Sequence, residues 1–130
     1  MKKVFLGGTC NGSEWRSRAI KLLNINYFDP VVDDWTLDAA EEEIRQKEIC
    51  DYCLYVITPK MKGVYSIAEV VDDSNKRPDK TILCILEEDG ECEFNSHTLR
   101  SLNAVKRLVK SNNAKVFNSL EEVVSYLNSK

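Results

Sequence analysis

This chain of 130 residues has a single histidine, only a small excess of negative charge and no long apolar run. The single histidine, His97, leaves any chemistry mainly to other side chains. The net charge of −3 and the absence of a dense basic cluster argue against non-specific nucleic-acid binding. No segment approaches the ~18 apolar residues of a membrane span, and Gly7 and Gly8 interrupt the N-terminal apolar stretch too early for a secretion signal. We therefore expect a cytoplasmic protein that binds neither nucleic acid nor membrane.

Cysteine is present in an odd number, five, which suits a reducing compartment better than a disulfide framework. The spacing of Cys50 and Cys53 is that of a CxxC pair. A metal or redox site would need a second ligand pair or a strand-to-helix placement, whereas this pair leads into an apolar run. We interpret both as structural cysteines and expect no metal and no cofactor.

The order of apolar patterns predicts one α/β domain over residues 1–130. Expected strands lie at 3–6, 25–30, 52–58, 81–87 and 114–117. Expected helices start near residue 13 and cover 36–49, 64–76, 96–110 and 119–128, with Thr36 as an N-cap candidate. This alternation predicts a flavodoxin-like three-layer sandwich around a five-stranded parallel sheet of order 2-1-3-4-5. The acidic stretch 87–96 is expected to be a loop.

Ligands of such sheets bind beyond the carboxyl ends of the strands where the strand order reverses, here between strands 1 and 3. The first segment at that point, GGTCNGSEWR, makes Gly7, Gly8 and Thr9 substrate-binding candidates. Glycines let the backbone approach a ligand, and N–H groups at a helix start favour an anion or hydroxyls. The same glycines also suit a simple turn, so this signal leaves both interpretations open.

The second segment, DPVVDDW, places two carboxylates and an indole after the second strand. Asp33 and Asp34 are able to accept hydrogen bonds from a sugar or a base, and Trp35 is able to stack on a ring. The alternative is that one aspartate starts the next helix while Trp35 packs into the core.

The third segment, PKMKGVYSIAE, opens a helix directly after the central strand. Tyr65, Ser66 and Glu69 share one side of that helix because they are three and four residues apart. A carboxylate there is suited to attack an anomeric carbon, and a neighbouring phenol to orient it. Such chemistry needs neither histidine nor metal. Periodicity alone favours Glu69 as a solvated helix residue, because it lies away from the centre of the apolar stripe.

Three blocks together carry a resemblance: VFLGGTCNGSEWR, YFDPVVDDW and the stretch from CDYCLYVITPKMKG to TILCIL. Over roughly residues 3–86 the chain resembles the nucleoside 2-deoxyribosyltransferase-like family. The resemblance implies that Glu69 is the nucleophile toward C1′ of the sugar and that Gly63 is the turn glycine before it. It also implies that Asp33 or Asp34 contacts the base or sugar, and that a neighbouring subunit completes the pocket of a homo-oligomer.

The leading functional hypothesis is a transferase or hydrolase of the N-glycosidic bond, acting on a (deoxy)nucleoside or nucleotide through Glu69. Well-studied transferases of the family that the chain resembles carry an acidic residue in the turn before the helix of Glu69, whereas this chain has the basic turn PKMKG. Its lysines, Lys60 and Lys62, favour a phosphorylated ligand. The alternative is a non-catalytic module that binds a nucleotide or a nucleotide-derived signal in the same crevice. A flavin-binding electron carrier fits less well, because the first loop lacks a hydroxyl-rich phosphate cradle.

Overall fold

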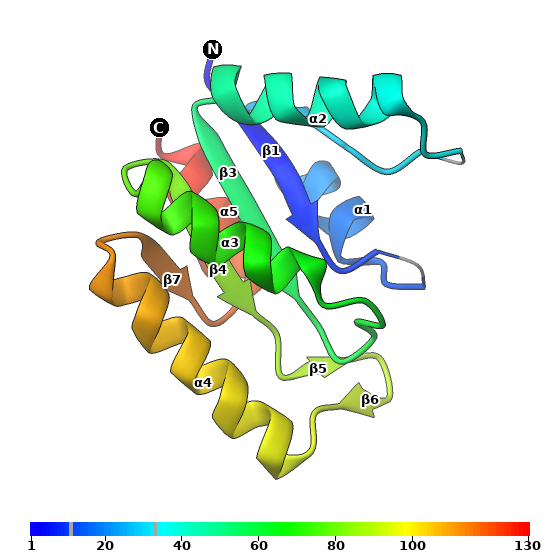
Figure 1. Ribbon diagram of the computed structural model, residues 1–130, viewed down its shortest axis with the longest axis vertical. Helices are drawn as coiled ribbons and strands as arrows, with labels where there is room; N and C mark the ends of the chain where they lie inside the picture. The colour runs from blue at the N-terminus through cyan, green and yellow to red at the C-terminus, as the bar shows by residue number, and fades with distance from the viewer. Residues whose placement is uncertain (11, 33) are drawn as a thin grey trace.

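The computed structural model describes residues 1–10, 12–32 and 34–130, which form a five-stranded parallel sheet covered by helices on both faces (Figure 1). The strands of this sheet are β1 (Lys3–Gly8), β2 (Asn26–Phe28), β3 (Tyr52–Ile57), β4 (Thr81–Ile85) and β7 (Lys115–Phe117). Their order is β2-β1-β3-β4-β7, which confirms the predicted flavodoxin-like topology.

Five helices connect and cover the strands: α1 (Trp15–Leu22), α2 (Leu37–Ile49), α3 (Tyr65–Lys76), α4 (Ser96–Ser111) and α5 (Leu120–Asn128). Figure 1 shows α2, α3 and α4 in front of the sheet, with α1 and α5 behind it. The start of α2 is capped as expected, because the hydroxyl of Thr36 accepts a hydrogen bond from the amide of Ala39 at 3.1 Å.

The alternation of side chains along the strands divides the core into two layers. Leu6, Leu54 and Val56 pack toward α1 and α5, with the indole of Trp15 buried among them. Phe5, Tyr55 and Ile57 pack on the opposite face against α3 and α4. Burial on both faces explains why β3 and β4 are nearly continuous apolar runs.

The stretch expected to be an acidic loop contains a small antiparallel hairpin, β5 (Glu88–Asp89) and β6 (Cys92–Glu93). Its turn holds Gly90 at φ +63°, a backbone conformation that favours glycine. Strands of two residues have no detectable period of hydrophobicity, so pattern analysis missed them.

None of the helices in the described ranges is long and apolar enough to cross a membrane. In the same part of the chain, no group of three or more His, Cys, Asp or Glu side chains is arranged to hold a metal ion. Cys50 and Cys53 are free and buried, and the thiol of Cys50 lies 3.6 Å from Oε1 of Gln46. Both therefore contribute to the core.

Candidate active site

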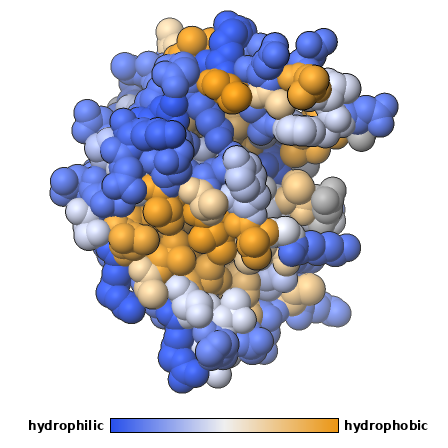
Figure 2. All heavy atoms as spheres, viewed as in Figure 1, coloured by the Kyte–Doolittle hydropathy of each residue, from blue (hydrophilic) through white to orange (hydrophobic). Residues whose placement is uncertain are grey.

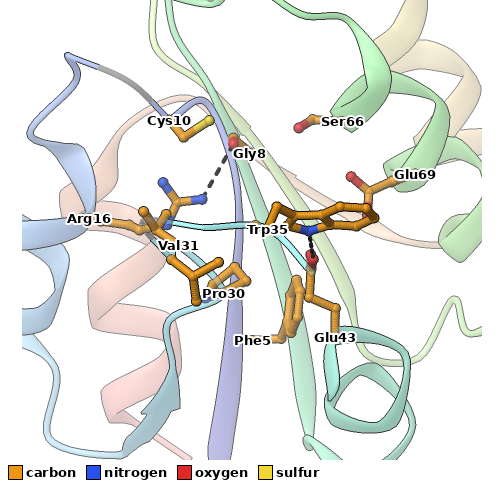
Figure 3. Close-up of a pocket in the computed structure, with 12 residues that line it drawn as sticks. Phe5, Gly8, Cys10, Arg16, Pro30, Val31, Trp35, Glu43, Ser66 and Glu69 are labelled. Atoms are coloured by element: carbon orange, nitrogen blue, oxygen red, sulfur yellow. Dashed lines mark hydrogen bonds between the residues drawn. The ribbon is translucent and has the colours of Figure 1, made fainter. Parts of the chain in front are cut away.

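Two adjoining cavities open at the carboxyl ends of β1 and β3, where the strand order reverses. Figure 3 shows the residues that line the larger of the two. Their volumes are about 300 Å³ and about 180 Å³. Four residues border both cavities: Gly8, Cys10, Ser66 and Glu69. The combined space is of the size that small-molecule sites use, so the arrangement is a candidate binding cleft for one small ligand.

The two glycines at the end of β1 are required by their neighbours in the sheet. A Cβ atom on Gly7 would lie 2.8 Å from the ring of Tyr55, and one on Gly8 would lie 2.1 Å from the carbonyl oxygen of Val56. Gly8 also has φ +115°, which side chains rarely tolerate. Close approach of β3 therefore demands glycine here whether or not a ligand binds, although both glycines line the larger cavity.

The loop after β1 is held by the buried guanidinium of Arg16. Its nitrogen atoms donate hydrogen bonds to the carbonyl oxygens of Leu6 at 2.9 Å, Thr9 at 2.9 Å and Gly8 at 3.3 Å. Burial lowers the pKa of Arg16, and the carboxylate of Asp29 at 3.6 Å opposes this change. Arg16 therefore acts as a rigid support for the floor of the cleft.

Thr9, a predicted substrate-binding residue, is buried and already engaged. Its hydroxyl accepts a hydrogen bond from the amide of Thr58 at 2.9 Å, and its carbonyl oxygen accepts one from the indole of Trp15 at 2.7 Å. Its amide donates to Val56. These bonds join the loops that follow β1 and β3, so the observed contacts of Thr9 are structural, at the wall of the smaller cavity.

The β5–β6 hairpin ties the same two loops from outside. The hydroxyl of Ser13 donates to the carboxylate of Asp89 at 2.6 Å, and the ammonium of Lys60 donates to the carbonyl oxygen of Gly12 at 3.2 Å. Lys60 and Asp89 are 3.9 Å apart. The hairpin thus supports the rim of the cleft, a role that the sequence analysis did not assign to it.

The loop after β2 contributes Trp35, whose side chain is 67 % exposed at the edge of the larger cavity. Its indole donates a hydrogen bond to Glu43 of α2 at 2.9 Å, which orients the ring. The alternative that Trp35 packs into the core is therefore wrong. Asp34 is exposed and borders neither cavity, while Asp33 lies outside the described residues.

The first turns of α3 reach the cleft as the topology predicts. Figure 3 shows Ser66 and Glu69 projecting from α3 into the space bordered by Gly8 and Trp35. Among the residues that the structure describes, no side chain caps the start of this helix, and Gly63 borders the smaller cavity just before it. The side chain of Glu69, which is mostly buried, therefore lies in the cleft, unlike a solvated surface residue.

The partner of the Glu69 carboxylate is Lys47 of α2, which forms an ion pair with it. Tyr65, the phenol expected beside Glu69, is 75 % exposed on the rim of the smaller cavity. In the described part of the chain its hydroxyl makes no hydrogen bond to Glu69.

The sequence analysis missed Arg16, Glu43 and Lys47. Polar residues at positions 43, 46 and 47 of α2 were a usable signal, because they share one helix face.

Comparison with known proteins agrees with this architecture. The chain belongs to the nucleoside 2-deoxyribosyltransferase-like family, whose sequence model matches residues 1–89. The matched region contains every residue described above as bordering the cleft. No curated protein and no solved structure matches the chain. Membership supports a general nucleoside-related function of the N-glycosidic type, with nucleosides as the small-molecule substrates of the family.

Proposed function

We propose that the protein cleaves the N-glycosidic bond of a (deoxy)nucleoside or nucleotide, with Glu69 as the nucleophile. The observation that carries this proposal is the position of the Glu69 carboxylate, which borders both cavities between the diglycine turn and Trp35. A carboxylate in such a cleft is suited to attack an anomeric carbon. Family membership supports the same chemistry.

In the proposed reaction an oxygen of Glu69 bonds to C1′ as the bond from C1′ to the base nitrogen breaks. The electron pair of the broken bond stays with the base, which takes a proton from water. A water molecule, or a second base, then attacks C1′ and gives its proton to the hydroxide that remains, while the electron pair of the ester bond returns to Glu69. Water as the second reactant gives a hydrolase, and a second base gives a transferase.

The other cleft residues have proposed roles in binding. The exposed face of Trp35 is suited to stacking on the base, an interaction worth about 1–3 kcal/mol. Ser66 lies one turn before Glu69 and is placed to donate to a sugar oxygen. Gly7, Gly8 and Gly63 would bind through the backbone, whereas Thr9, whose amide and carbonyl are already hydrogen-bonded within the protein, would only form part of the cavity wall. A contact from Asp33 or Asp34 stays a prediction, and Asp34 would have to move to reach the cleft.

A phosphorylated substrate is favoured by Lys62 more than by Lys60. The ammonium of Lys60 already bonds to Gly12 and faces Asp89, whereas Lys62 borders the smaller cavity. We propose that this cavity receives the 5′ end of the substrate.

The decisive experiment is chromatography of a mixed pool of nucleosides and nucleotides before and after incubation with the protein. We expect a free base to appear, and mass spectrometry to find the sugar on Glu69 after rapid quenching. Glu69→Gln should abolish both signals. The matched control is Asp72→Asn, since Asp72 lies on the same helix in an exposed ion pair with Lys76 and borders neither cleft cavity. Base release by Glu69→Gln at the normal rate would refute the proposal.

A second candidate is a binding module that leaves its ligand intact, and the ion pair between Glu69 and Lys47 favours it. Ion pairs between a carboxylate and a lysine are common in proteins without catalytic activity, so this pair is also consistent with a structural role of Glu69. Thermal stabilisation by a nucleotide that is recovered unchanged after long incubation would establish this alternative.

We also propose a homo-oligomer, as predicted from the resemblance. Several large apolar side chains are well exposed on or beside the helices that carry Lys47 and Glu69: Leu37, Ile44, Val64 and Tyr65. Figure 2 shows apolar atoms on α2 and a larger patch over α3 and α4. Sedimentation should show a dimer or larger species that Ile44→Glu dissociates. A cytoplasmic location stays a prediction.

A further inference from the structure

Lys47 reaches from α2 to the carboxylate of Glu69 on α3, a contact that was not predicted from the sequence. We propose that Lys47 is a positioning residue: it holds one oxygen of Glu69, presents the other to C1′, and stabilises the carboxylate when the sugar ester breaks down. This inference rests on the proposed function.

The contact is a packed one. The ammonium of Lys47 donates to Oε2 of Glu69, and the two side chains are only 15 % and 17 % exposed. The same ammonium lies 5.6 Å from the ring centroids of both Phe5 and Tyr55. Cations are attracted to aromatic faces at such distances. Three contacts from three different elements therefore restrict a side chain that is normally among the most flexible.

The contact also distinguishes the two oxygens of Glu69. Oε2 is bound by Lys47, whereas Oε1 has no hydrogen-bond partner within the described residues. Tyr65 does not compete for the orienting role, because its side chain lies exposed on the rim. The free oxygen is thus available to C1′, and the bound oxygen fixes the plane of the carboxylate.

The charge of Lys47 affects the two chemical steps differently. Forming the ester at Oε1 converts Oε2 into a neutral carbonyl oxygen, and breaking the ester restores the negative charge. A hydrogen bond from an ammonium to a carboxylate is stronger than one to a neutral oxygen. Lys47 therefore stabilises the free carboxylate relative to the ester, and should speed ester breakdown more than ester formation.

The test compares Lys47→Met, which keeps the length of the side chain and removes the charge, with Lys47→Arg, which keeps the charge. Lys76→Met is the control, since it removes an exposed lysine from the ion pair with Asp72 on α3. Each protein is quenched during turnover of a 2′-deoxynucleoside, and the fraction with sugar on Glu69 is measured alongside kcat and KM.

For Lys47→Met we expect kcat to fall about tenfold or more with KM unchanged or lower, and the fraction carrying the sugar to rise several-fold. Lys47→Arg should recover part of the rate, and Lys76→Met should match the unmodified protein. If Lys47→Met does not fold, Lys47→Gln is measured in the same way. Turnover and adduct fraction equal to those of Lys76→Met would overturn the inference and leave Glu69 as the nucleophile.

A second measurement separates this outcome from failure of the proposed function. The side-chain carboxyl carbon of Glu69, observed by NMR without any substrate, should change its resonance in Lys47→Met and not in Lys76→Met. No change would overturn the inference independently of activity. If the resonance changes but the unmodified protein neither releases a base nor carries a sugar, the proposed function fails and the positioning role fails with it.

Discussion

Two of the three carboxylates on helix α3, Glu69 and Asp73, lie one turn apart in different surroundings, and the difference separates the proposed reactive group from a stabilising one. Asp73 is 2 % exposed, and both its oxygens are engaged: Tyr55 donates to one and Arg77 to the other. Glu69 borders a cavity and has one oxygen engaged by Lys47. A carboxylate whose bonds are all satisfied stabilises the fold, whereas one that keeps an oxygen beside a cavity is available for reaction.

The region around Asp73 also disfavours further negative charge. Burial, followed by the charge of Asp73, raises the pKa of the Tyr55 phenol above its ordinary range. Burial and then Asp73 likewise raise the pKa of the Cys53 thiol to about 12. Both groups therefore stay protonated in the folded protein at neutral pH, and Tyr55 remains a hydrogen-bond donor.

The largest expected effect is the loss of activity in Glu69→Gln. We expect base release to fall by at least about 1,000-fold, equivalent to about 4 kcal/mol, because the proposed nucleophile is removed. The melting temperature should fall less than in Asp73→Asn, since the side chain of Glu69 is 17 % exposed whereas that of Asp73 is 3 % exposed. Single-turnover kinetics and calorimetry measure the two quantities. Strong destabilisation by this variant would break the comparison with Asp73.

Asp73→Asn should give the reverse result. Removing one partner of a buried ion pair typically lowers the free energy of unfolding by about 3–5 kcal/mol. Here the partly buried positive charge of Arg77 loses the negative charge of Asp73 beside it. Urea unfolding measures the loss. The folded fraction should still release base at close to the normal rate per molecule, and a much lower rate would show that Asp73 also affects the cleft.

The two phenols near these carboxylates provide a matched pair of smaller changes. Tyr55→Phe removes a buried hydrogen bond to a charged group and should cost about 1.5–3 kcal/mol of folding free energy. Tyr65→Phe should leave stability unchanged and alter turnover by less than about threefold, because its hydroxyl is exposed. A large loss of kcat in Tyr65→Phe would restore the orienting role expected from the sequence.

The smallest effect concerns alkaline pH. An unfolded thiol ionises around its ordinary pKa of 9.0, whereas folded Cys53 and Cys84 do so only at about 12. Above pH 9 the unfolded state therefore releases protons that the folded state keeps, and stability falls as the pH rises from about 9 to about 12. Below pH 9 these thiols are protonated in both states and contribute no pH dependence.

Urea unfolding at pH 8 and pH 10 checks this prediction. The decrease should become smaller in Cys53→Ala once the cost of the substitution at pH 8 is subtracted. Cys92→Ala is the control because Cys92 is exposed. An equal decrease in both variants would mean that the burial of Cys53 does not control its ionisation.

Most of the architecture was predictable because local patterns agree with the tertiary arrangement. The predicted apolar run forms β3, which is buried on both faces, and the predicted N-cap residue Thr36 caps helix α2. The hairpin at 88–93 was not predictable, since its short strands depend on contacts with Ser13 and Lys60 from distant loops. Pattern analysis detects repeats along one element and is insensitive to such single contacts.

The candidate site was predictable in part. Topology placed the loops after β1 and β3 at one cleft, so Gly8, Ser66 and Glu69 were found from the sequence. Lys47 was missed because charges on a helix usually indicate a solvated face. Thr9 was found, but its hydroxyl and carbonyl groups are bound within the protein.

By itself the sequence determined the order of strands and helices and the end of the sheet at which a ligand would bind, because hydrophobic period and the handedness of crossovers are properties of the local chain. Only the tertiary structure decided which charged groups meet. The pairing of Glu69 with Lys47, and of Asp73 with Tyr55 and Arg77, depends on how α2 and β3 pack beside α3. Interactions between charges depend on distances of a few ångströms, which side-chain packing sets and sequence spacing does not.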